Sequence, residues 1–409
     1  MMSRSHKWTF KTRFRTGAYG WKASVLASRR LKEAVREIER AAKSDPVLAG
    51  EGVVTLLERL WPSLQDIDTS SGSLGNAVNR MLDELIPVLI DAPADLATRQ
   101  RWMDRLYDAV AEDGVNYLSA VEDQWGDICG FPEPANRWAD RMIPAVREGW
   151  AGDEPGGWIV GTTLCLSCLV KTERFGELKE LLSPRSGRFW HFDKFWAQAL
   201  ARQGHTDQAL AYAESCRTIY SYDDHNITRF CERVLLDAGR RDEAYRRYGL
   251  AAATAGTNVA VFGEIARKYP EREPRQVLVD LIQTHGNKGK WFAAAKDAGY
   301  LDLALACAGA ISAEPSTLIR AARDFLELDL QFAALVALHA LDHLLAGSGY
   351  EPTTMDAVSA YEHLMAAANK LGKCDWAGAK VQELLARGCP SDRTEMRRAV
   401  AAKLQREIR

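Results

Sequence analysis

Apolar residues recur along most of the chain at the three- and four-residue spacing that places them on one face of an α-helix. The clearest case is the stretch 78–89, with apolar residues at Val78, Met81, Leu82, Leu85, Ile86 and Leu89. The pattern predicts an all-α protein. Its N-terminal part is expected to hold helices over 23–43, 46–60, 96–112 and 115–128, one after the loop 66–75, and one that ends near 148.

Prolines and polar residues mark where these helices begin and end. Asp45 and Pro46 are predicted to be the N-cap and first residue of a helix, which Pro62 is expected to end. Pro87 is expected to kink the helix that contains it. The Ser/Gly-rich loop 66–75 could bind an anion at the following helix N-terminus, but it lacks the Gly-Lys-Ser/Thr ending of a phosphate-binding loop. A flexible loop with a serine N-cap is the favoured interpretation.

A segment rich in turn-forming residues, 149–157, is the strongest predicted boundary in the chain. It separates an N-terminal helical region, 23–148, from a region of shorter paired helices, 158–409. A basic, aromatic arm, 1–22, precedes both regions.

Two matching copies of a helix–turn–helix pattern lie within 195–251. Leu200, Gly204 and Ala209 of the first copy correspond to residues 35 positions later, Leu235, Gly239 and Ala244. The same spacing from a turn residue to a small residue recurs from Gly299, Gly372 and, with Asp in place of Gly, Asp329, and more weakly from Thr172 and Arg272. Because one helix pair cannot bury its apolar face alone, stacked pairs predict an α-solenoid.

These copies resemble tetratricopeptide repeats (TPRs), whose helix-A Leu, turn Gly and helix-B Ala have this relative spacing. Tyr248 and Ala251 also fall where the family has an aromatic and a small residue. The copies depart from the family at Thr206 and Arg241, where an aromatic is usual, and neither ends in proline. The resemblance implies a superhelix of TPR-like helix pairs that binds peptides or proteins in a concave groove.

Charge is distributed unevenly along the 409 residues. The net charge is −2, yet residues 1–44 hold twelve Lys and Arg against three Glu. A basic arm on an acidic remainder suggests contact with an anionic partner or with the protein's own surface. No run of 18 apolar residues and no secretory signal is present, and eight cysteines in so long a chain are not a disulfide framework, so we expect a cytoplasmic protein without a membrane partner.

The arm supplies the candidates for nucleic-acid or anion binding, because cations meet phosphates and aromatic rings stack on bases. These candidates are Arg4, Lys7, Trp8, Lys11, Arg13, Arg15 and Lys22. Partial alternation over 8–15 permits a short strand or an extended arm. In the alternative that we favour, the aromatics pack on the first helices while the cations stay in solvent.

A second group of candidates is aromatic and is expected to contact a bound peptide or partner protein. It comprises Phe189, Trp190, His191, Phe192, Phe195 and Trp196, together with Tyr220 and Tyr222. Packing between helices is the alternative for these rings, and the more common role of such residues.

No motif predicts catalysis, a metal or a cofactor. His339 and His343 have an i, i+4 spacing that can chelate a metal, but Ala340 stands where a zincin has Glu. Cys165 and Cys168 lie in an apolar helical pattern, and His225 follows two aspartates in a loop. We therefore expect a non-catalytic cytoplasmic scaffold that binds a partner protein, with a nucleic-acid-binding helical-repeat protein as the alternative.

Overall fold

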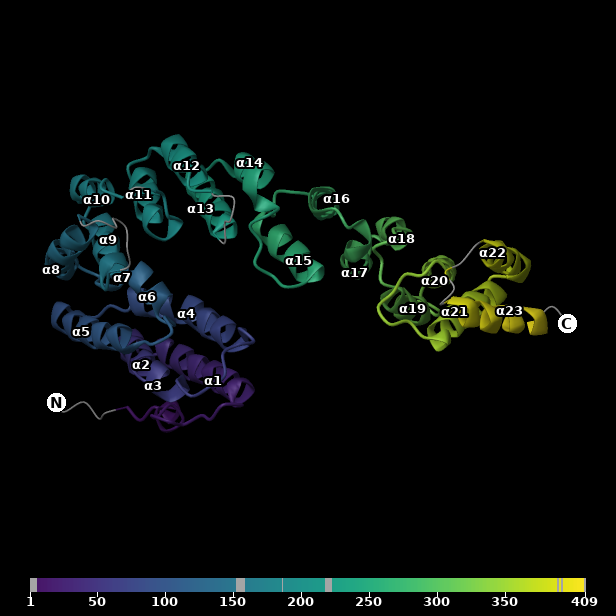
Figure 1. The fold of residues 1–409 in the computed structure, drawn as a ribbon, viewed down its shortest axis with the longest axis horizontal. Coiled ribbons are helices and arrows are strands. Elements are labelled where there is room, and N and C mark those ends of the chain that lie inside the picture. The colour runs from purple at the N-terminus through teal and green to yellow at the C-terminus, as the bar shows by residue number, and fades with distance from the viewer. Residues whose placement is uncertain are drawn as a thin grey trace. The chain divides into compact units, whose positions relative to one another are not determined.

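The computed structural model describes residues 6–151, 159–185, 187–217, 223–387, 390 and 393–407. Within these residues every regular element is a helix, which confirms the all-α prediction (Figure 1). The chain divides into two compact units, Met1–Ile227 and Thr228–Arg409, and the division falls within α13 (Asp224–Asp237).

The first unit begins with a single 3₁₀ turn and continues through helices of four to nineteen residues. In order they are η1 (Thr9–Thr12), α1 (Ser24–Ala42), α2 (Pro46–Leu57), α3 (Leu60–Leu64), α4 (Ser73–Asp91), α5 (Leu96–Glu112), α6 (Ser119–Asp123), α7 (Trp125–Ile128), α8 (Pro132–Trp150), α9 (Thr162–Lys171), α10 (Phe175–Leu182), α11 (Trp190–Arg202) and α12 (Thr206–Glu214).

After α13, the second unit continues with further helices, each packed on its neighbours in the sequence. They are α14 (Arg241–Ala244), η2 (Tyr245–Gly249), α15 (Asn258–Lys268), α16 (Pro274–His285), η3 (Lys288–Trp291), α17 (Phe292–Asp297), α18 (Leu301–Ala308), α19 (Pro315–Asp324), α20 (Leu330–Leu345), α21 (Thr354–Lys370), α22 (Cys374–Ala386) and α23 (Thr394–Glu407).

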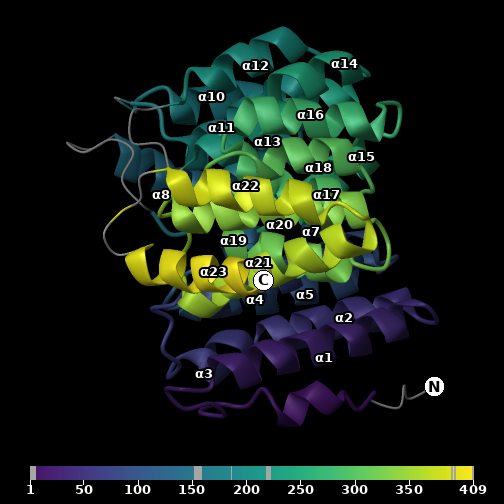
Figure 2. The same cartoon turned by 90° about the vertical axis from the view of Figure 1, so that its right-hand side faces the viewer.

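Helices α1, α2 and α4 pack on one another and form the start of the first unit's core, with α5 packed on α2. Figure 2 shows α1 and α2 side by side. The buried face of α1 holds Leu31, Val35 and Ile38, which the helical spacing predicts. Further along, α8 packs on α9. These helices flank the predicted boundary 149–157, of which 152–157 lies outside the described residues, and that boundary remains a prediction.

The turns of the repeat region have the geometry that the sequence pattern predicts. Gly204 has φ +78°, and across it the N–H of His205 donates to the carbonyl of Leu200 at 3.0 Å. This is the hydrogen bond of a Schellman helix end, which a glycine can adopt without strain. The corresponding bond spans Gly239, from Arg240 to Leu235. The small residues that follow are fully buried at Ala209, Ala244, Ala304, Ala334 and Ala377, where a short side chain lets helices approach closely.

Two of the weaker copies differ from the predicted register. Glu173, not Thr172, has the positive φ of +57°, so the copy is shifted by one residue and buries Leu178. Asp329 is not in a glycine-like conformation, because its side chain accepts from the N–H of Phe332 and caps α20. An aspartate at a helix start satisfies an N–H that would otherwise lack a partner.

The second copy of the strongest repeat pair is irregular in its second helix. After only four α-helical residues, α14 continues as the π-helical turn η2. The wider turn shifts the buried positions, so Tyr248 and Ala252 are buried whereas the predicted Ala251 is exposed. The TPR-like register is therefore kept up to Tyr248 and lost after it.

Several predicted helix ends also have to be corrected. The Asp45 cap on α2 is confirmed, since its carboxylate accepts from the N–H of Leu48 at 2.9 Å. Pro62 does not end a helix but lies in the first turn of α3, where its missing N–H costs nothing. The N-cap of α4 is Gly72 rather than a serine.

Candidate functional site

A row of basic side chains, Arg29, Lys32, Arg36, Arg40 and Lys43, runs along the exposed face of α1 and its C-cap. We call it the α1 stripe. Successive members lie three or four residues apart, which is the spacing of neighbours on one helix face. Like charges at this spacing destabilise a helix by about 0.2–0.5 kcal/mol per pair. The stripe therefore costs α1 stability.

The N-terminal arm occupies two of the three acidic side chains of α1, Glu33 and Glu37, and its described residues make no hydrogen bond or ion pair with the third, Glu39. The carboxylate of Glu37 accepts from the backbone N–H of Thr9 at 2.7 Å and of Phe10 at 3.2 Å. Glu33 is paired with Arg13 of the arm and lies 4.0 Å from Arg29. In the described part of the chain, Lys32, Arg36, Arg40 and Lys43 have no ion pair.

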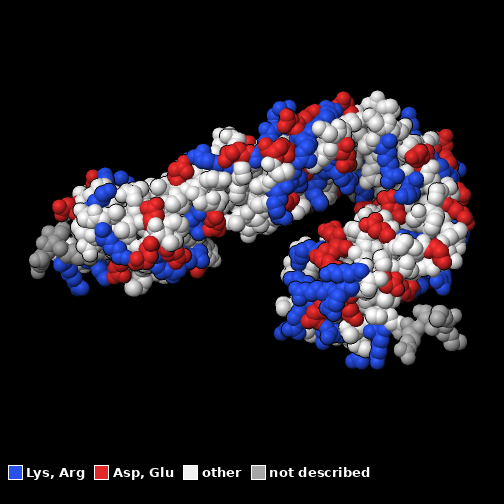
Figure 3. All heavy atoms as spheres, turned by 180° about the vertical axis from the view of Figure 1, so that it is seen from behind, with Lys and Arg blue, Asp and Glu red and all other residues white. Residues whose placement is uncertain are grey.

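Two adjoining hollows follow the stripe where α1 faces α4, and together we call them the α1–α4 groove. One, of about 380 Å³, is lined by Leu31, Lys32, Val35, Arg36, Glu39, Ala77, Arg80, Met81 and Glu84. The other, of about 620 Å³, is lined by Arg36, Glu39, Arg40, Ala42, Lys43 and Val88. Figure 3 shows Lys and Arg side chains gathered in a dense patch on the part of the first unit that its first helices form. Cations outnumber carboxylates in the lining of each hollow, by three to two and by three to one, so the groove fits a negatively charged ligand.

The arm is held on the first helices by its aromatic residues. Trp8, Phe10, Phe14 and Tyr19 are all at most 4% exposed. The Trp8 ring lies so close to Gly52 of α2 that a Cβ there would meet it at 2.5 Å. The arm contains the 3₁₀ turn η1, so the strand considered for 8–15 is absent from it. A buried Trp8 has no face free to stack on a base, and for these four rings the alternative in which the aromatics pack on the first helices is the one observed, whereas Trp21 of the arm is 66% exposed.

The cations predicted on the arm lie in solvent, with one exception. Lys7, Lys11, Arg15 and Lys22 are exposed, whereas Arg13 pairs with Glu33. Arg4 lies outside the described residues. The candidates predicted from the sequence end at Lys22 and include no residue of the α1 stripe. The recurrence of Lys and Arg at 32, 36 and 40 would have indicated this stripe from the sequence.

The aromatic candidates in α11 are mostly internal. Trp190, Phe192 and Phe195 are at most 5% exposed, so these rings pack between helices, as in the alternative interpretation. Arg185 contributes to this packing, because its guanidinium lies 5.3 Å from the Trp150 ring centroid and pairs with the buried Asp193 at 2.8 Å.

The remaining members of the aromatic group retain some exposed surface or are not described. Phe189, the N-cap of α11, is 51% exposed, and His191 and Trp196 are half-buried. The ring nitrogen Nε2 of His191 lies 3.1 Å from the Thr163 hydroxyl. Tyr220 and Tyr222 lie outside the described residues. Whether Phe189, His191 or Trp196 contacts a partner remains a prediction.

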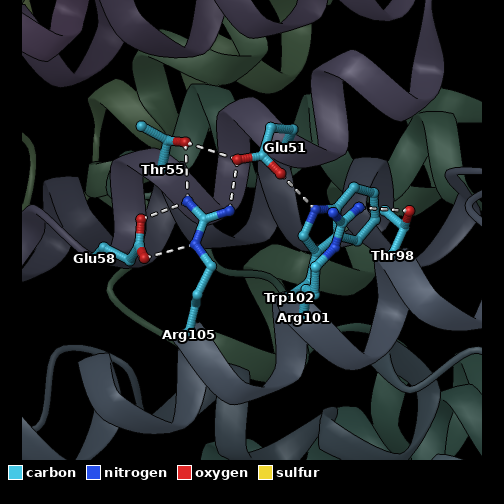
Figure 4. Close-up of polar contacts among 7 residues, drawn as sticks. All are labelled: Glu51, Thr55, Glu58, Thr98, Arg101, Trp102 and Arg105. Carbon is cyan, nitrogen blue, oxygen red and sulfur yellow. Dashed lines mark hydrogen bonds and ion pairs between the residues drawn. The ribbon is translucent and has the colours of Figure 1, made fainter.

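A second polar cluster joins α2 to α5, and its donors and acceptors bind one another (Figure 4). Arg105 donates to both carboxylate oxygens of Glu58, at 2.7 and 2.6 Å, and to Glu51 at 2.5 Å. These bonds raise the pKa of the Arg105 guanidinium. Trp102 donates its indole N–H to Glu51 at 2.7 Å. The cluster connects two helices, and both of its carboxylates already accept hydrogen bonds within it, which favours a structural role over ligand binding.

The histidines and cysteines singled out in the sequence lie in packed surroundings. His343 is buried, with Nε2 placed 2.7 Å from the carbonyl oxygen of Ala308. Cys165 and Cys168 are fully buried, and burial raises the pKa of the Cys165 thiol to about 12. In the described ranges no group of three His, Cys, Asp or Glu side chains is arranged to hold a metal ion. The same residues include no helix long and apolar enough to cross a bilayer.

Comparisons with known proteins add little to this description. No protein family model matches the chain, and no curated protein sequence matches it. A solved circular tandem repeat protein, with novel repeat topology and enhanced subunit contact surfaces, aligns over 94% of this chain and 89% of its own at 15% identity and a TM-score of 0.19. A TM-score this low carries no argument about fold or function.

Proposed function

We propose that the protein is a non-catalytic scaffold of TPR-like helix pairs, and that it binds an acidic segment of a partner protein in the α1–α4 groove. The observation that carries the proposal is the α1 stripe, of which Lys32, Arg36, Arg40 and Lys43 are exposed and lack ion pairs within the described residues. A negatively charged ligand would offset the repulsion along the stripe, so binding would relieve a cost that α1 otherwise bears. The free thiols of the described cysteines fit a cytoplasmic location.

Two carboxylates in the groove favour a protein segment over a nucleic acid. Glu39 lies beside Arg36 and Arg40 on one wall, and Glu84 belongs to the other wall. A uniform polyanion would be repelled at both positions, whereas a protein segment of mixed charge can place a Lys or Arg opposite each of them. The burial of Trp8 removes the stacking surface on which the nucleic-acid alternative partly depends.

The proposal is tested with tagged full-length protein in a lysate of its source organism, followed by crosslinking and mass spectrometry. Lys32→Glu changes the stripe, and Lys290→Glu is the matched control, because it reverses an exposed lysine of the other unit. We expect the wild-type protein to recover a partner protein in stoichiometric amount, crosslinked to α1, and nuclease treatment should not reduce this recovery. The partner should be lost with Lys32→Glu and retained with Lys290→Glu.

Recovery of the same partner with Lys32→Glu, crosslinks only outside the first helices, or failure to recover any protein would each overturn the proposal. Nuclease-sensitive recovery would support the nucleic-acid alternative instead. Deleting residues 1–22 is not a suitable test, because it would remove four buried aromatic side chains from the core.

A further inference from the structure

The α1 stripe continues toward the N-terminus of the helix as an apolar surface. Val25 lies four residues before Arg29, on the same helix face, and is 81% exposed. Trp21 precedes it by four residues and is 66% exposed. Trp21 lies in the turn that precedes α1 and Val25 in the first turn of the helix, so the N-terminal end of this patch exposes apolar side chains and the rest of it, the stripe, exposes cations.

Trp21 is held in place by its backbone. Its carbonyl oxygen accepts from the N–H of Asp68 at 3.0 Å, and the Asp68 carboxylate in turn accepts from the N–H of Ser70 at 2.9 Å. The preceding chain is held as well, since the N–H of Gly17 donates to the carbonyl of Pro62 at 3.1 Å. The backbone of Trp21 therefore loses little conformational entropy when a partner binds. An exposed aromatic residue held in this way is well suited to anchor a partner.

The length and spacing of the patch fit an α-helix. Val25 and Lys43 are 18 residues apart, which is about 27 Å along a helix. Lys32, Arg36 and Arg40 follow one another at about 6 Å, and carboxylates at i, i+4 and i+8 of a second helix have the same spacing. An anionic membrane surface fits less well, because Glu39 and Glu84 in the groove would face its negative charge without a cation to pair with.

We infer that the partner segment is an amphipathic helix of about five turns, with acidic residues placed on the α1 stripe and one apolar end seated on Trp21 and Val25. The inference rests on the proposed function and adds to it the anchor, the length and the helical form of the partner. Burying Trp21 and Val25 should strengthen binding roughly tenfold over the contribution of charge alone.

Fluorescently labelled helical peptides of 18 residues test the inference with the full-length protein. Each peptide has Glu at three positions spaced by four, and either two Leu or two Ala at one end, with both ends tried in turn. Affinities are measured by fluorescence anisotropy for the wild-type protein, for Lys32→Glu, for the double variant W21A/V25A, and for the double variant I311A/Y350A. The last is the control, since Ile311 and Tyr350 are exposed in the other unit.

The Leu-ended peptide is expected to bind about tenfold more tightly than the Ala-ended peptide. This gain should appear with the two Leu at one terminus of the peptide and not at the other, because the partner helix binds in one direction. W21A/V25A should abolish that difference and leave the affinity for the Ala-ended peptide unchanged, whereas Lys32→Glu should weaken both peptides. I311A/Y350A should change neither.

Equal affinities for the Leu- and Ala-ended peptides, or a Leu advantage that survives W21A/V25A, would overturn the inference and leave the proposed function standing. No effect of Lys32→Glu, or no binding of either peptide to the wild-type protein, would overturn both. Co-sedimentation with vesicles of phosphatidylserine that W21A/V25A abolishes, without peptide binding, would assign the patch to a membrane surface and overturn the inference.

Discussion

Replacing Lys32 by glutamate is expected to stabilise α1 while it weakens partner binding. Lys32 has Arg29 three residues before it and Arg36 four residues after it. The other two positions at these distances are uncharged, Ser28 and Val35. Reversing the charge of Lys32 therefore turns both helix-surface pairs from repulsive to attractive, and creates no new repulsive pair at these spacings.

The size of the effect follows from these two pairs. Each pair is worth about 0.2–0.5 kcal/mol in either direction, so its reversal changes the free energy of unfolding by about 0.4–1 kcal/mol. Two pairs give about 1–2 kcal/mol at low salt, because lysine and glutamate have similar helix propensities. Lys32 is exposed and has no ion pair to lose among the described residues. A gain of this size corresponds to roughly 5- to 30-fold less opening of the helix.

Hydrogen–deuterium exchange of the full-length protein measures this directly in peptides from Ser24–Ala42. Exchange of α1 should slow in Lys32→Glu at low salt, and the gain should shrink at high salt as the charges are screened. Lys290→Glu should leave α1 unchanged. Unchanged or faster exchange of α1 in Lys32→Glu at low salt would refute the claim that the stripe is unneutralised.

Three further predictions concern stability. Arg105→Ala removes the donor of Glu58 and leaves Glu51 its bond from Trp102, so it should destabilise the α2–α5 contact by about 1–2 kcal/mol, seen as faster exchange in both helices. Arg101→Ala is the matched control, expected to change the stability of this contact by less than about 0.5 kcal/mol. Burial raises the pKa of the Glu122 carboxyl to about 7 from its ordinary 4.5, so the folded state binds more protons than the unfolded state between these values, and this contribution to stability is lost as pH rises through 7. Glu122→Gln should therefore raise the free energy of unfolding, measured in urea, by on the order of 2 kcal/mol at pH 8 and have little effect at pH 4.5; an equal gain at both pH values would contradict the assignment. Gly204→Ala should lower the free energy of unfolding by about 1 kcal/mol, because Gly204 has φ +78°, although its Cβ would have open space. Gly263→Ala, within α15 and equally uncrowded, should raise it by about as much. Thermal unfolding of the two variants compares them.

The features that could be predicted from the sequence are those set by local physical rules. The Asp45 cap depends only on one side chain and the N–H groups that follow it, and it is found where expected. The Schellman turns at Gly204 and Gly239 likewise follow from residues within one helix end. The apolar spacing correctly located Leu31, Val35 and Ile38 on the buried face of α1, because one helix has one face toward the core. The same spacing also predicts Val25 to be buried, and that prediction is wrong, because Val25 is 81% exposed.

The features that could not be predicted depend on contacts between distant segments. The conformation of residues 8–15 is set by rings that fit against α2, and a Trp8 ring needs Gly52, 44 residues away, to reach its position. The π-helical turn η2 moves the buried position from Ala251 to Ala252, although nothing in the local spacing indicates the extra residue. Trp190, Phe192 and Phe195 could equally have lined a groove, since an aromatic run has the same pattern in a core and at an interface.

The candidate site depends on both kinds of information. The sequence shows that Lys and Arg recur along 29–43, but it also places Glu33 and Glu37 on the same helix, so its formal charge alone does not indicate a free basic surface. The structure adds that the arm binds both glutamates, through Arg13 and through the N–H groups of Thr9 and Phe10. The arm thus has two effects on α1: its rings cover an apolar side of the first helices, and its polar groups bind Glu33 and Glu37, which leaves Glu39 as the one glutamate of α1 beside the stripe. A helix with such a basic surface is less stable than one whose cations are paired with carboxylates of the same helix. A partner that supplies carboxylates would pair with these cations and stabilise α1.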